Sequence, residues 1–429
     1  MTPEVKKRIE QIRQGIVPEG YKKGKIGIVP IKWNEVPFST LFTSTSEYTD
    51  DLKQYPLYSL TIEDGITAKT ERYERSHLVK KENSYKVVRP NDYAYNPMNI
   101  RFGAVARHKG DIPVAVSGYY DIFTTVHESD LVFMDSFLTY GPMITYYNKV
   151  STGSLVEKQR VHFSDFLEFS LALPPLEERK KIAEILSTQD KAIELQGRKI
   201  EELKRFKKGC LEKMFPKKGQ KVPEKRFPGF TDDWEQRKLS DLAEKTYGGG
   251  TPTTSNEAYW NGDIPWIQSS DVVDGKLLGV EPRKWITQGG LNNSAAQLIP
   301  ENSIAIITRV GVGKLAFMPY SYATSQDFLS LSKLNVEPFF AVYACYKKLQ
   351  SELNAVQGTS IKGITKDELL AKSIMVPRYA EQQQIGAFFK QLDKLITLHQ
   401  RKLDEMKKQK KALMQLLLTG IVKTKGEVR

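Results

Sequence analysis

Residues 174–214 read PPLEERKKIAEILSTQDKAIELQGRKIEELKRFKKGCLEKM, and residues 377–417 read PRYAEQQQIGAFFKQLDKLITLHQRKLDEMKKQKKALMQLL. A shift of 203 residues aligns the two stretches without a gap. The residues related by this shift include Pro174/Pro377, Glu178/Glu381, Ile182/Ile385, Asp190/Asp393, Ile193/Ile396, Leu195/Leu398 and Lys207/Lys410. Self-similarity at a fixed spacing is the signature of an architecture built from copies of one unit. The repeat therefore predicts two related halves, each ending in a long helix.

Both stretches carry seam positions at alternating steps of four and three residues, the spacing of a coiled-coil seam. The apolar seam positions are Ile182, Leu186, Ile193, Ile200, Leu203, Ile385, Phe389, Leu392, Ile396, Leu403 and Met406. Gln189, Gln196, His399 and two lysines are polar seam positions, which weaken a seam but fix its register and partner. Two similar seams in one chain favour antiparallel pairing of the helices with each other. The alternative is that each helix packs on its own domain.

The segments before the helices correspond more loosely. Trp33–Leu41 resembles Trp234–Leu242, and Gly103–Ala106 resembles Gly313–Ala316 at a shift of 210. We therefore expect an α+β fold with two globular domains and two long antiparallel coiled-coil helices, related by a pseudo-twofold repeat. The expected segments are an N-terminal helical segment at 1–24, domains at 25–172 and 218–375, and helices at 173–217 and 376–429.

Composition restricts the class of protein. The 429 residues carry a net charge of +13, which favours a polyanionic partner but does not establish one. Two cysteines far apart suggest no disulfide framework, and no apolar run is long enough to span a membrane. Because the N-terminus also lacks a secretory signal, we expect a cytoplasmic protein.

Motifs for chemistry are missing or incomplete. Gly311-Val312-Gly313-Lys314 is followed by Leu315, whereas a phosphate-binding loop needs Ser or Thr there to hold Mg²⁺. Asn96-Pro97-Met98-Asn99 lacks the second proline and the aromatic residue of the adenine-methyltransferase signature. The five histidines and two cysteines show no metal-ligand spacing. We therefore expect a chain without a catalytic site and without a bound metal or cofactor.

Several motifs resemble the specificity subunits of Type I restriction–modification systems. Arg226–Trp234, the loop Gly248-Gly249-Gly250-Thr251-Pro252 and Tyr259–Ile267 resemble the start of a target-recognition domain in that family. Val376–Ile396 and Leu417–Gly420 resemble the two ends of its conserved helix. The resemblance covers nearly the whole chain in the right order. The first domain is the weaker match, since Phe42–Ser46 replaces the glycine-rich loop.

The resemblance implies a reader of double-stranded DNA. Each recognition domain would read one half of a split target, while the helices act as a spacer and dock partner subunits. Two modification subunits would bind S-adenosylmethionine and methylate adenine. Restriction subunits, where present, would use ATP and Mg²⁺ to translocate and cut unmethylated DNA. The rival from another class is a non-catalytic coiled-coil scaffold for proteins, and a third is an enzyme with divergent motifs.

Side chains that can hydrogen-bond base edges or phosphates are the candidates for DNA contact. In the first domain they are Thr43, Ser44, Arg72, Arg75, Asn99, Arg101, Arg107, Lys109, Lys158 and Arg160. In the second they are Thr251, Thr253, Thr254, Ser255, Ser269, Asp271, Arg309, Lys314, Ser360 and Lys362. The basic outer faces of the helices have two interpretations that we weigh equally: solvated surface, or contact with phosphates or partners.

Overall fold

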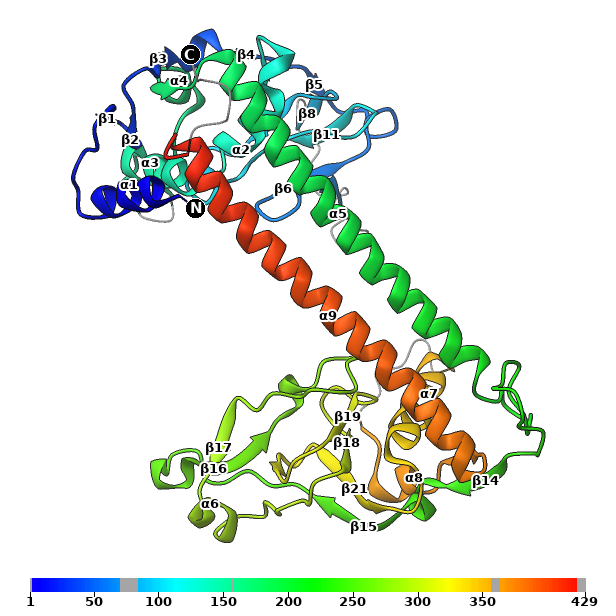
Figure 1. Ribbon diagram of the computed structural model, residues 1–429. Helices are drawn as coiled ribbons and strands as arrows, with labels where there is room; N and C mark the ends of the chain where they lie inside the picture. Colours follow the sequence, from blue (N-terminus) through cyan, green and yellow to red (C-terminus); the bar gives the residue numbers. More distant parts are fainter. Residues whose placement is uncertain (1, 70–83, 156–157, 356–362, 423–429) are drawn as a thin grey trace. The chain divides into compact units, whose positions relative to one another are not determined.

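The computed structural model describes residues 2–69, 84–155, 158–355 and 363–422. The chain divides into two compact units (Figure 1). Unit 1 comprises residues 1–195 and 403–429, and unit 2 comprises residues 196–402. Each unit therefore contains one globular domain, one end of helix α5 (Leu176–Lys213) and one end of helix α9 (Tyr379–Leu418).

The domain of unit 1 is rich in short strands. Its elements are α1 (Pro3–Arg13), β1 (Tyr21–Gly24), β2 (Gly27–Pro30), β3 (Asn34–Pro37), η1 (Phe38–Thr40), β4 (Phe42–Ser44), β5 (Tyr48–Thr49), β6 (Tyr58–Thr61), β7 (Gly65–Ala68), β8 (Tyr85–Val88), β9 (Tyr93–Tyr95), η3 (Ile100–Phe102), β10 (Val105–Arg107), β11 (Val114–Ser117), β12 (Asp121–Thr125), η4 (Glu128–Asp130), α2 (Leu131–Phe137), α3 (Gly141–Val150), α4 (Phe163–Leu167) and β13 (Ser170–Leu173). The largest sheet has the order β10-β9-β12-β4.

The domain of unit 2 repeats this plan. Its elements are β14 (Glu235–Lys238), η6 (Leu239–Leu242), β15 (Ala243–Gly248), η7 (Glu257–Tyr259), β16 (Trp260–Ile267), η8 (Ser269–Asp271), β17 (Lys284–Ile286), α6 (Gln288–Asn292), β18 (Ser303–Ile307), β19 (Leu315–Met318), β20 (Ala323–Thr324), β21 (Phe328–Leu334), α7 (Pro338–Ala355), α8 (Lys366–Leu370) and β22 (Ser373–Val376). Its largest sheet has the order β19-β18-β21-β15.

The two largest sheets correspond strand for strand, and all their pairings are antiparallel. The turns confirm the loose repeat as well, because Gly103 and Gly313 both adopt a positive φ just before β10 and β19. A two-stranded sheet joins the two ends of each domain, β3 with β13 and β14 with β22. The expected α+β fold with two related domains is confirmed. The glycine-rich segment 311–314 lies in the β18–β19 turn.

Helices α5 and α9 begin and end at the expected signals. Pro174-Pro175 precedes α5, and Gly420 follows α9 with φ +67, the left-handed conformation that closes a helix. Of the apolar seam positions, seven are buried and four are half-buried. The half-buried ones are Ile193, Leu203, Ile396 and Met406. In each unit the start of one helix packs with the end of the other, so the two helices pair antiparallel.

The polar seam positions pair according to the repeat. In unit 2, Gln196 Nε2 lies 2.8 Å from His399 Nδ1, and these two residues are counterparts at the shift of 203. In the same unit Lys207 Nζ lies 2.6 Å from Asp393 Oδ1. The counterpart pair, Lys410 and Asp190, forms an ion pair of 2.5 Å in unit 1. Gln196, His399 and the two lysines thus have specific partners across the seam.

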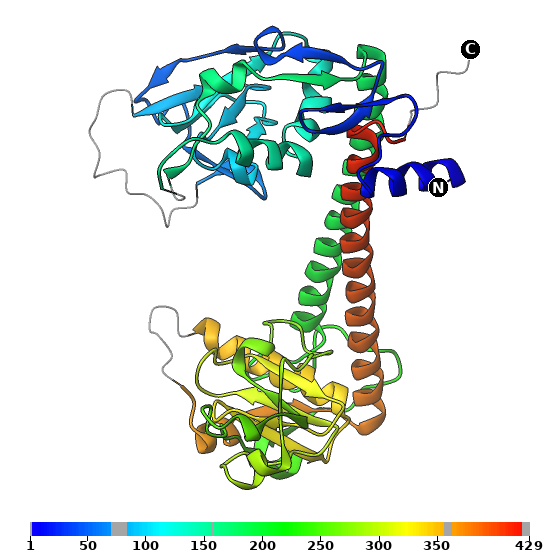
Figure 2. The same ribbon diagram turned by 90° about the vertical axis from the view of Figure 1, so that its left-hand side faces the viewer.

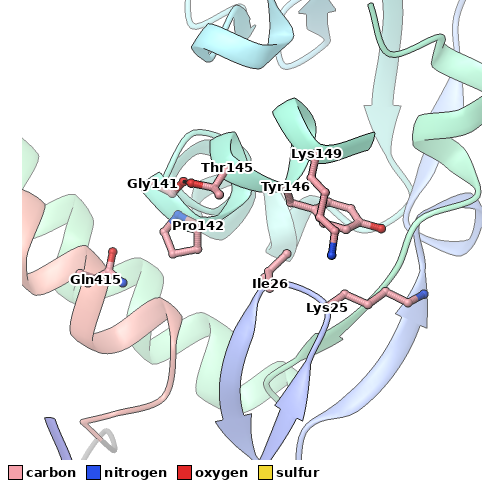
Figure 3. Close-up of a pocket in the computed structure, with 8 residues that line it drawn as sticks. All are labelled: Lys25, Ile26, Gly141, Pro142, Thr145, Tyr146, Lys149 and Gln415. Carbon is pink, nitrogen blue, oxygen red and sulfur yellow. Dashed lines mark hydrogen bonds between the residues drawn. The ribbon is translucent and has the colours of Figure 1, made fainter. Parts of the chain in front are cut away.

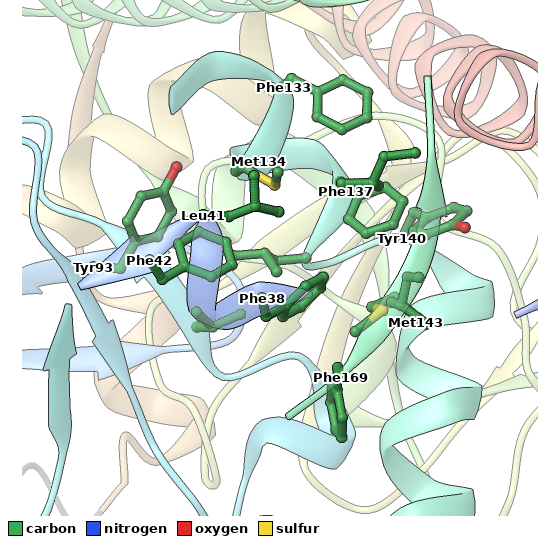
Figure 4. Packing of buried hydrophobic residues seen from close by; sticks show 14 of the residues in the cluster. Phe38, Leu41, Phe42, Tyr93, Phe133, Met134, Phe137, Tyr140, Met143 and Phe169 are labelled. Atoms are coloured by element: carbon green, nitrogen blue, oxygen red, sulfur yellow. The ribbon is translucent and has the colours of Figure 1, made fainter. Parts of the chain in front are cut away.

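The ends of both helices belong to the hydrophobic cores of the domains. In unit 1, Ile182 and Leu186 of α5 and Leu417 and Leu418 of α9 join one core with aromatic side chains from β4, β9, α2 and α4. Figure 4 shows part of this cluster, including Phe38, Phe42 and Phe137. In unit 2, Leu211 and Met214 meet Ile385 and Phe389 in the same way. Seam residues of α5 and α9 therefore contact the other helix, and those at the helix ends also pack on the domains.

The first residues of the chain close unit 1. Residues 3–13 of the expected helical segment form α1, which ends just before Gly15 (φ +76), and Tyr21–Gly24 form a strand. Helix α1 lies beside the C-terminal end of α9 (Figure 2). Arg8 Nη1 donates to the carbonyl of Ile421 at 2.5 Å, and the Tyr21 hydroxyl donates to the carbonyl of Gly420 at 2.7 Å. These contacts attach the first residues of the chain to the segment that follows α9.

Helix α9 approaches α7 closely at Gly386. A Cβ at this position would lie 2.2 Å from Glu337 Oε2 and 2.9 Å from the backbone nitrogen of Phe340. At Gly209 of α5 a Cβ would meet nothing within 4 Å. We expect Gly209→Ala to raise stability by up to about 1 kcal/mol through helix propensity. Gly386→Ala should lower it by about 1–3 kcal/mol through overpacking. Thermal unfolding of the two variants checks this, and equal shifts would contradict it.

The Lys207–Asp393 pair is mostly covered, with side-chain exposures of 9% and 13%. Tyr343 of α7 donates to Asp393 Oδ2 at 2.6 Å, and burial together with this carboxylate raises the pKa of the Tyr343 hydroxyl. Lys207→Ala leaves a buried carboxylate without its cation, so we expect a loss of about 3–5 kcal/mol.

Lys410→Ala is the matched control for Lys207→Ala, because its partner Asp190 is half exposed. Its expected cost is about 0–1 kcal/mol. Denaturant unfolding of both variants measures the difference in the free energy of unfolding. A cost at Lys410 equal to that at Lys207 would contradict the larger stabilising role that we assign to the Lys207–Asp393 pair.

Candidate nucleic-acid interface

Four strand ends of unit 2 converge on one side of its domain. β15 ends at Gly248 opposite Leu329 at the start of β21, and β18 ends at Ile307 opposite Phe328. β16 ends at Ile267, which pairs with Thr324 of β20. We call the segments that follow these strand ends, together with their neighbours, the loop edge of unit 2. They are residues 248–255, 268–271, 283–284, 308–314 and 325–327.

The glycine-rich loop is fastened to this edge by its backbone. Gly250 donates its N–H to the carbonyl of Thr324 at 2.8 Å, and its own carbonyl accepts from Trp266 Nε1 at 3.0 Å. A Cβ at Gly249 would lie 2.0 Å from the Ser325 carbonyl oxygen. The glycines are therefore needed for close approach of two backbones. This approach presents Thr251 at the surface, where its hydroxyl donates to Gln326 Oε1 at 2.6 Å.

The structure brings most candidates of the second domain to this edge. Thr251, Thr253, Thr254, Ser255 and Arg309 are exposed there, and Ser269 and Lys314 are half-buried. The side chain of Asp271 is fully covered, which differs from the exposed position that a direct base contact needs. Its carboxylate accepts from the backbone of Gln268 and caps the short helix η8. Ser360 and Lys362 lie outside the described residues.

Unit 1 has a corresponding loop edge, formed by residues 44–45, 96–103, 119–121 and 158–160. Ser44 of β4 pairs with Phe123, and Tyr95 of β9 pairs with both Val105 and Asp121. Segment 158–160 joins this edge because Val161 donates to the carbonyl of Pro97 at 3.1 Å. Ile364 donates to Thr308 at the matching place in unit 2, 2.7 Å away.

The candidates of the first domain are divided by the structure. The exposed side chains of Ser44, Asn99 and Lys158 and the half-buried Arg160 belong to the loop edge, and exposed Thr43 precedes it. Arg101 also lies there, but it is buried and donates to Gln159 Oε1 at 2.7 Å. Arg72 and Arg75 lie outside the described residues.

Arg107 ends β10 and Lys109 follows it, at the end of this strand that points away from the loop edge. Arg107 makes a bidentate contact with Asp135 of α2 at 2.9 and 2.8 Å, and Lys109 lies 3.2 Å from the same carboxylate. Although burial opposes it, the hydrogen bonds that Arg107 donates to Asp135 raise the pKa of the Arg107 guanidinium. In this structure Arg107 therefore fixes α2 to the sheet.

Sequence reasoning missed three side chains of the loop edge of unit 2. Gln326 is exposed in the turn between β20 and β21. Lys284 pairs with Trp266 across β16 and β17, and Arg283 precedes it. Nothing in the local sequence marks them, because they reach the edge only through strand pairing and a turn.

A cavity of about 480 Å³ lies in unit 1 between α3, the β1–β2 turn and the end of α9 (Figure 3). Its lining includes Lys25, Tyr146, Lys149 and Gln415. Lys25 is 3.8 Å from Glu35 at the surface. Within residues 2–69, 84–155, 158–355 and 363–422, no group of histidine, cysteine and acidic side chains is placed to hold a metal ion. No described helix is long and apolar enough to cross a membrane.

Two β-rich domains and two long helices that pair through a repeated seam define a class of proteins built from an internal repeat. The family model for the Type I restriction modification DNA specificity domain matches residues 136–205 and 231–408, together more than half of the chain. The chain therefore belongs to the family of type I restriction–modification specificity subunits. A specificity subunit recognises the DNA target and is itself the non-catalytic subunit of the enzyme. In this family the cofactors generally reside on partner subunits, and the subunit works in a complex.

Individual relatives agree with this assignment. A protein of Methanocaldococcus jannaschii, provisionally named as the MjaX specificity subunit of a type I restriction enzyme, is 25% identical over 98% of this chain and 93% of its own length. The EcoR124I/EcoR124II specificity subunit of Escherichia coli is 31% identical over 38% of this chain and 41% of its own length.

A solved type I S subunit from M. genitalium shares the fold. Its TM-score is 0.54 at 12% identity, over 92% of this chain and 99% of that one. A chain from a structure concerning complex assembly and conformational transition of the type I R–M system gives a TM-score of 0.55 at 19% identity, with the same coverage. The expected arrangement of two β-rich domains and two long packed helices is confirmed by this likeness.

Neighbouring glycines allow a test of the loop edge of unit 2. Gly249→Ala should displace the loop that carries Thr251 and lower sequence-specific DNA binding of the assembled complex by at least about tenfold, equivalent to ~1.4 kcal/mol. Gly248→Ala is the control, because a Cβ there meets nothing within 4 Å. Binding to a target duplex and to a scrambled duplex measures the effect. Equal behaviour of the two variants would contradict a role for this loop.

Proposed function

We propose that this subunit reads a bipartite DNA target, with one half assigned to each unit. The observation that carries this proposal is the pair of corresponding loop edges on sheets of the same strand order. We assign the recognition domains to residues 25–172 and 218–375, within the two units. The helical segments 173–217 and 376–429 connect them, and residues 1–24 complete the first unit.

The side chains at the two edges support an asymmetric target. Unit 1 offers Ser44, Asn99 and Arg160, whereas unit 2 offers Thr251 and Arg309 among others. An asparagine amide matches adenine, and an arginine matches guanine, through pairs of hydrogen bonds in the major groove. Lysines and hydroxyl groups serve mainly as phosphate contacts that set position. Because the edges differ in chemistry, the two halves of the target should differ in sequence.

The long helices suit the role of a spacer between the half-targets. Helix α5 has 38 residues, or about 57 Å at ~1.5 Å per residue. Half-sites on one face of duplex DNA are separated by multiples of about 34–36 Å. A helix of this length is thus of the right scale to fix a spacing of one turn or more.

The helix pair also offers a surface for partner subunits. In unit 2, Phe206, Leu395 and Leu398 are 56%, 40% and 51% exposed. Phe206 and the half-buried Phe388 lie 6.5 Å apart between ring centroids. Exposed apolar groups gathered on one helical pair are typical of protein-binding surfaces. Leu195 of unit 1, the repeat counterpart of Leu398, is 58% exposed.

We assign one modification subunit to each of these two surfaces, which share the counterparts Leu195 and Leu398, and place restriction subunits on the resulting complex. S-adenosylmethionine would bind the modification subunits, whereas ATP and Mg²⁺ would bind the restriction subunits. The complex would act on double-stranded DNA in the cytoplasm of a bacterial or archaeal cell.

Exchange of one domain tests the proposal directly. Replacing residues 226–372 with the recognition domain of another specificity subunit should change one half of the methylated target and leave the other half and the spacing unchanged. The reason is that each loop edge is built within one unit. Mapping methylated adenines in a host that expresses the partner subunits gives the readout.

The matched control replaces the first domain instead, which should change the other half of the target. A change in both halves after either exchange would contradict independent reading. A complex that assembles normally but binds no duplex with sequence preference would favour the protein scaffold instead.

A further inference from the structure

A buried acidic side chain lies beneath the loop edge of unit 2. Asp271 has a fully covered side chain, and its Oδ2 accepts the N–H of Gln268 at 3.0 Å. Its Oδ1 has an exposed area below 1 Å² and makes no hydrogen bond within the described part of the chain. A buried carboxylate oxygen without a partner is costly, because it loses water without replacing it. A hydrogen-bond donor or a positive charge is therefore expected to face Asp271 Oδ1.

The group that faces this oxygen is Arg283. Its Nε lies 3.5 Å from Asp271 Oδ1, while its side chain is 68% exposed. The other end of the guanidinium is thus in solvent, and its two Nη atoms make no hydrogen bond to any residue that the structure describes. The guanidinium thus faces the carboxylate on one side, without a hydrogen bond to it, and solvent on the other.

The backbone around Arg283 is well fixed. The next residue, Lys284, begins β17 and pairs with Trp266 of β16. Its Nζ lies 5.6 Å from the ring centroid of Trp260 and 5.8 Å from that of Trp266. Asp271 is itself held by the reciprocal hydrogen bonds that cap η8. Both partners therefore come from short, ordered segments.

This arrangement suits the reading of one particular base. Guanine presents two acceptors, N7 and O6, in the major groove, and arginine reaches both through parallel N–H groups. The negative charge 3.5 Å from Nε attracts the guanidinium and favours orientations in which its Nη groups point away from Asp271, toward a ligand at the surface. A phosphate can also accept two parallel N–H groups from arginine, so only the dependence on base sequence separates the two contacts. Lys284 beside Arg283 offers a charge that suits a phosphate.

We propose that Arg283 reads a guanine in the half-target of unit 2 and that Asp271 is its positioning residue. The proposal rests on the function proposed above and adds a named base class to it. It also gives Asp271 an indirect role in place of the direct DNA contact that the sequence suggested.

The test compares three variants of the chain, each assembled with its modification subunits. They are Arg283→Ala, Asp271→Asn and the control Lys284→Ala. Binding is measured against the wild-type target and against duplexes in which each G·C pair of the unit 2 half is replaced in turn. Asparagine retains an oxygen for the Gln268 N–H but removes the charge facing Arg283.

Arg283→Ala should lower discrimination at one G·C pair by about 5- to 150-fold, the range for one bidentate contact. Other positions, and the unit 1 half, should be read as before. Asp271→Asn should weaken discrimination at the same pair by a smaller factor, with an unchanged melting temperature. Lys284→Ala should weaken binding to all duplexes equally and reduce the salt dependence.

Two results would overturn the inference while leaving the proposed function intact. One is an Arg283→Ala complex that loses affinity equally for every duplex, which would make Arg283 a phosphate contact. The other is a unit 2 half-target without a G·C pair, or one read normally by the variant. Failure of the wild-type complex to prefer any bipartite sequence would instead refute the proposed function.

Discussion

The repeated apolar seam is the constraint on which the rest of the structure depends. A helix of about 40 residues with one apolar stripe must bury that stripe along its whole length. A single small domain can cover only part of it. The chain meets this requirement by pairing α5 with α9 and by inserting the ends of both helices into the domain cores. The seam thus makes each domain depend on both helices, including the one that lies far away in the sequence.

The pattern of similarity between the halves follows from this constraint. Seam residues contact counterparts from the other repeat, as Gln196 and His399 do, so a change on one helix must suit the other. In the described part of the chain, no side chain of a loop edge pairs with its counterpart from the other repeat. Exposed side chains of the edges, such as Arg309 and Asn99, follow strands whose pairing involves other residues, so we expect their substitution to leave the sheets intact. A fold with a fixed frame and variable edges is one in which target sequence can change while assembly is retained.

The two paired helices were predictable, because a shift of 203 residues and a period of 3.5 residues can be recognised in the sequence without knowledge of the fold. The ion pair between Lys207 and Asp393 recurs through that repeat as the pair between Lys410 and Asp190. The edge was only partly predictable. Thr251 and Arg309 stand beside glycine loops and strand ends, which the sequence marks. Arg283 and Gln326 do not, because strand pairing brings them to the edge. The sequence also did not indicate which polar side chains are exposed. Arg101 and Asp271 have the chemistry of DNA-binding residues, but both are buried and make hydrogen bonds within their own domains.

The use of one chain for two related halves answers a problem of symmetry. The proposed complex with two copies of one modification subunit needs two docking surfaces, and exposed counterparts such as Leu195 and Leu398 of the paired helices are our candidates for them. A true homodimer would supply them too, but its recognition surfaces would be identical and its target palindromic. Joining the two copies covalently lets each edge diverge separately while the seam remains symmetric. The polar seam positions support this solution, because polar pairs specify register and partner at some expense of stability. In this chain they pair repeat with repeat, which favours the intramolecular arrangement over mispaired helices.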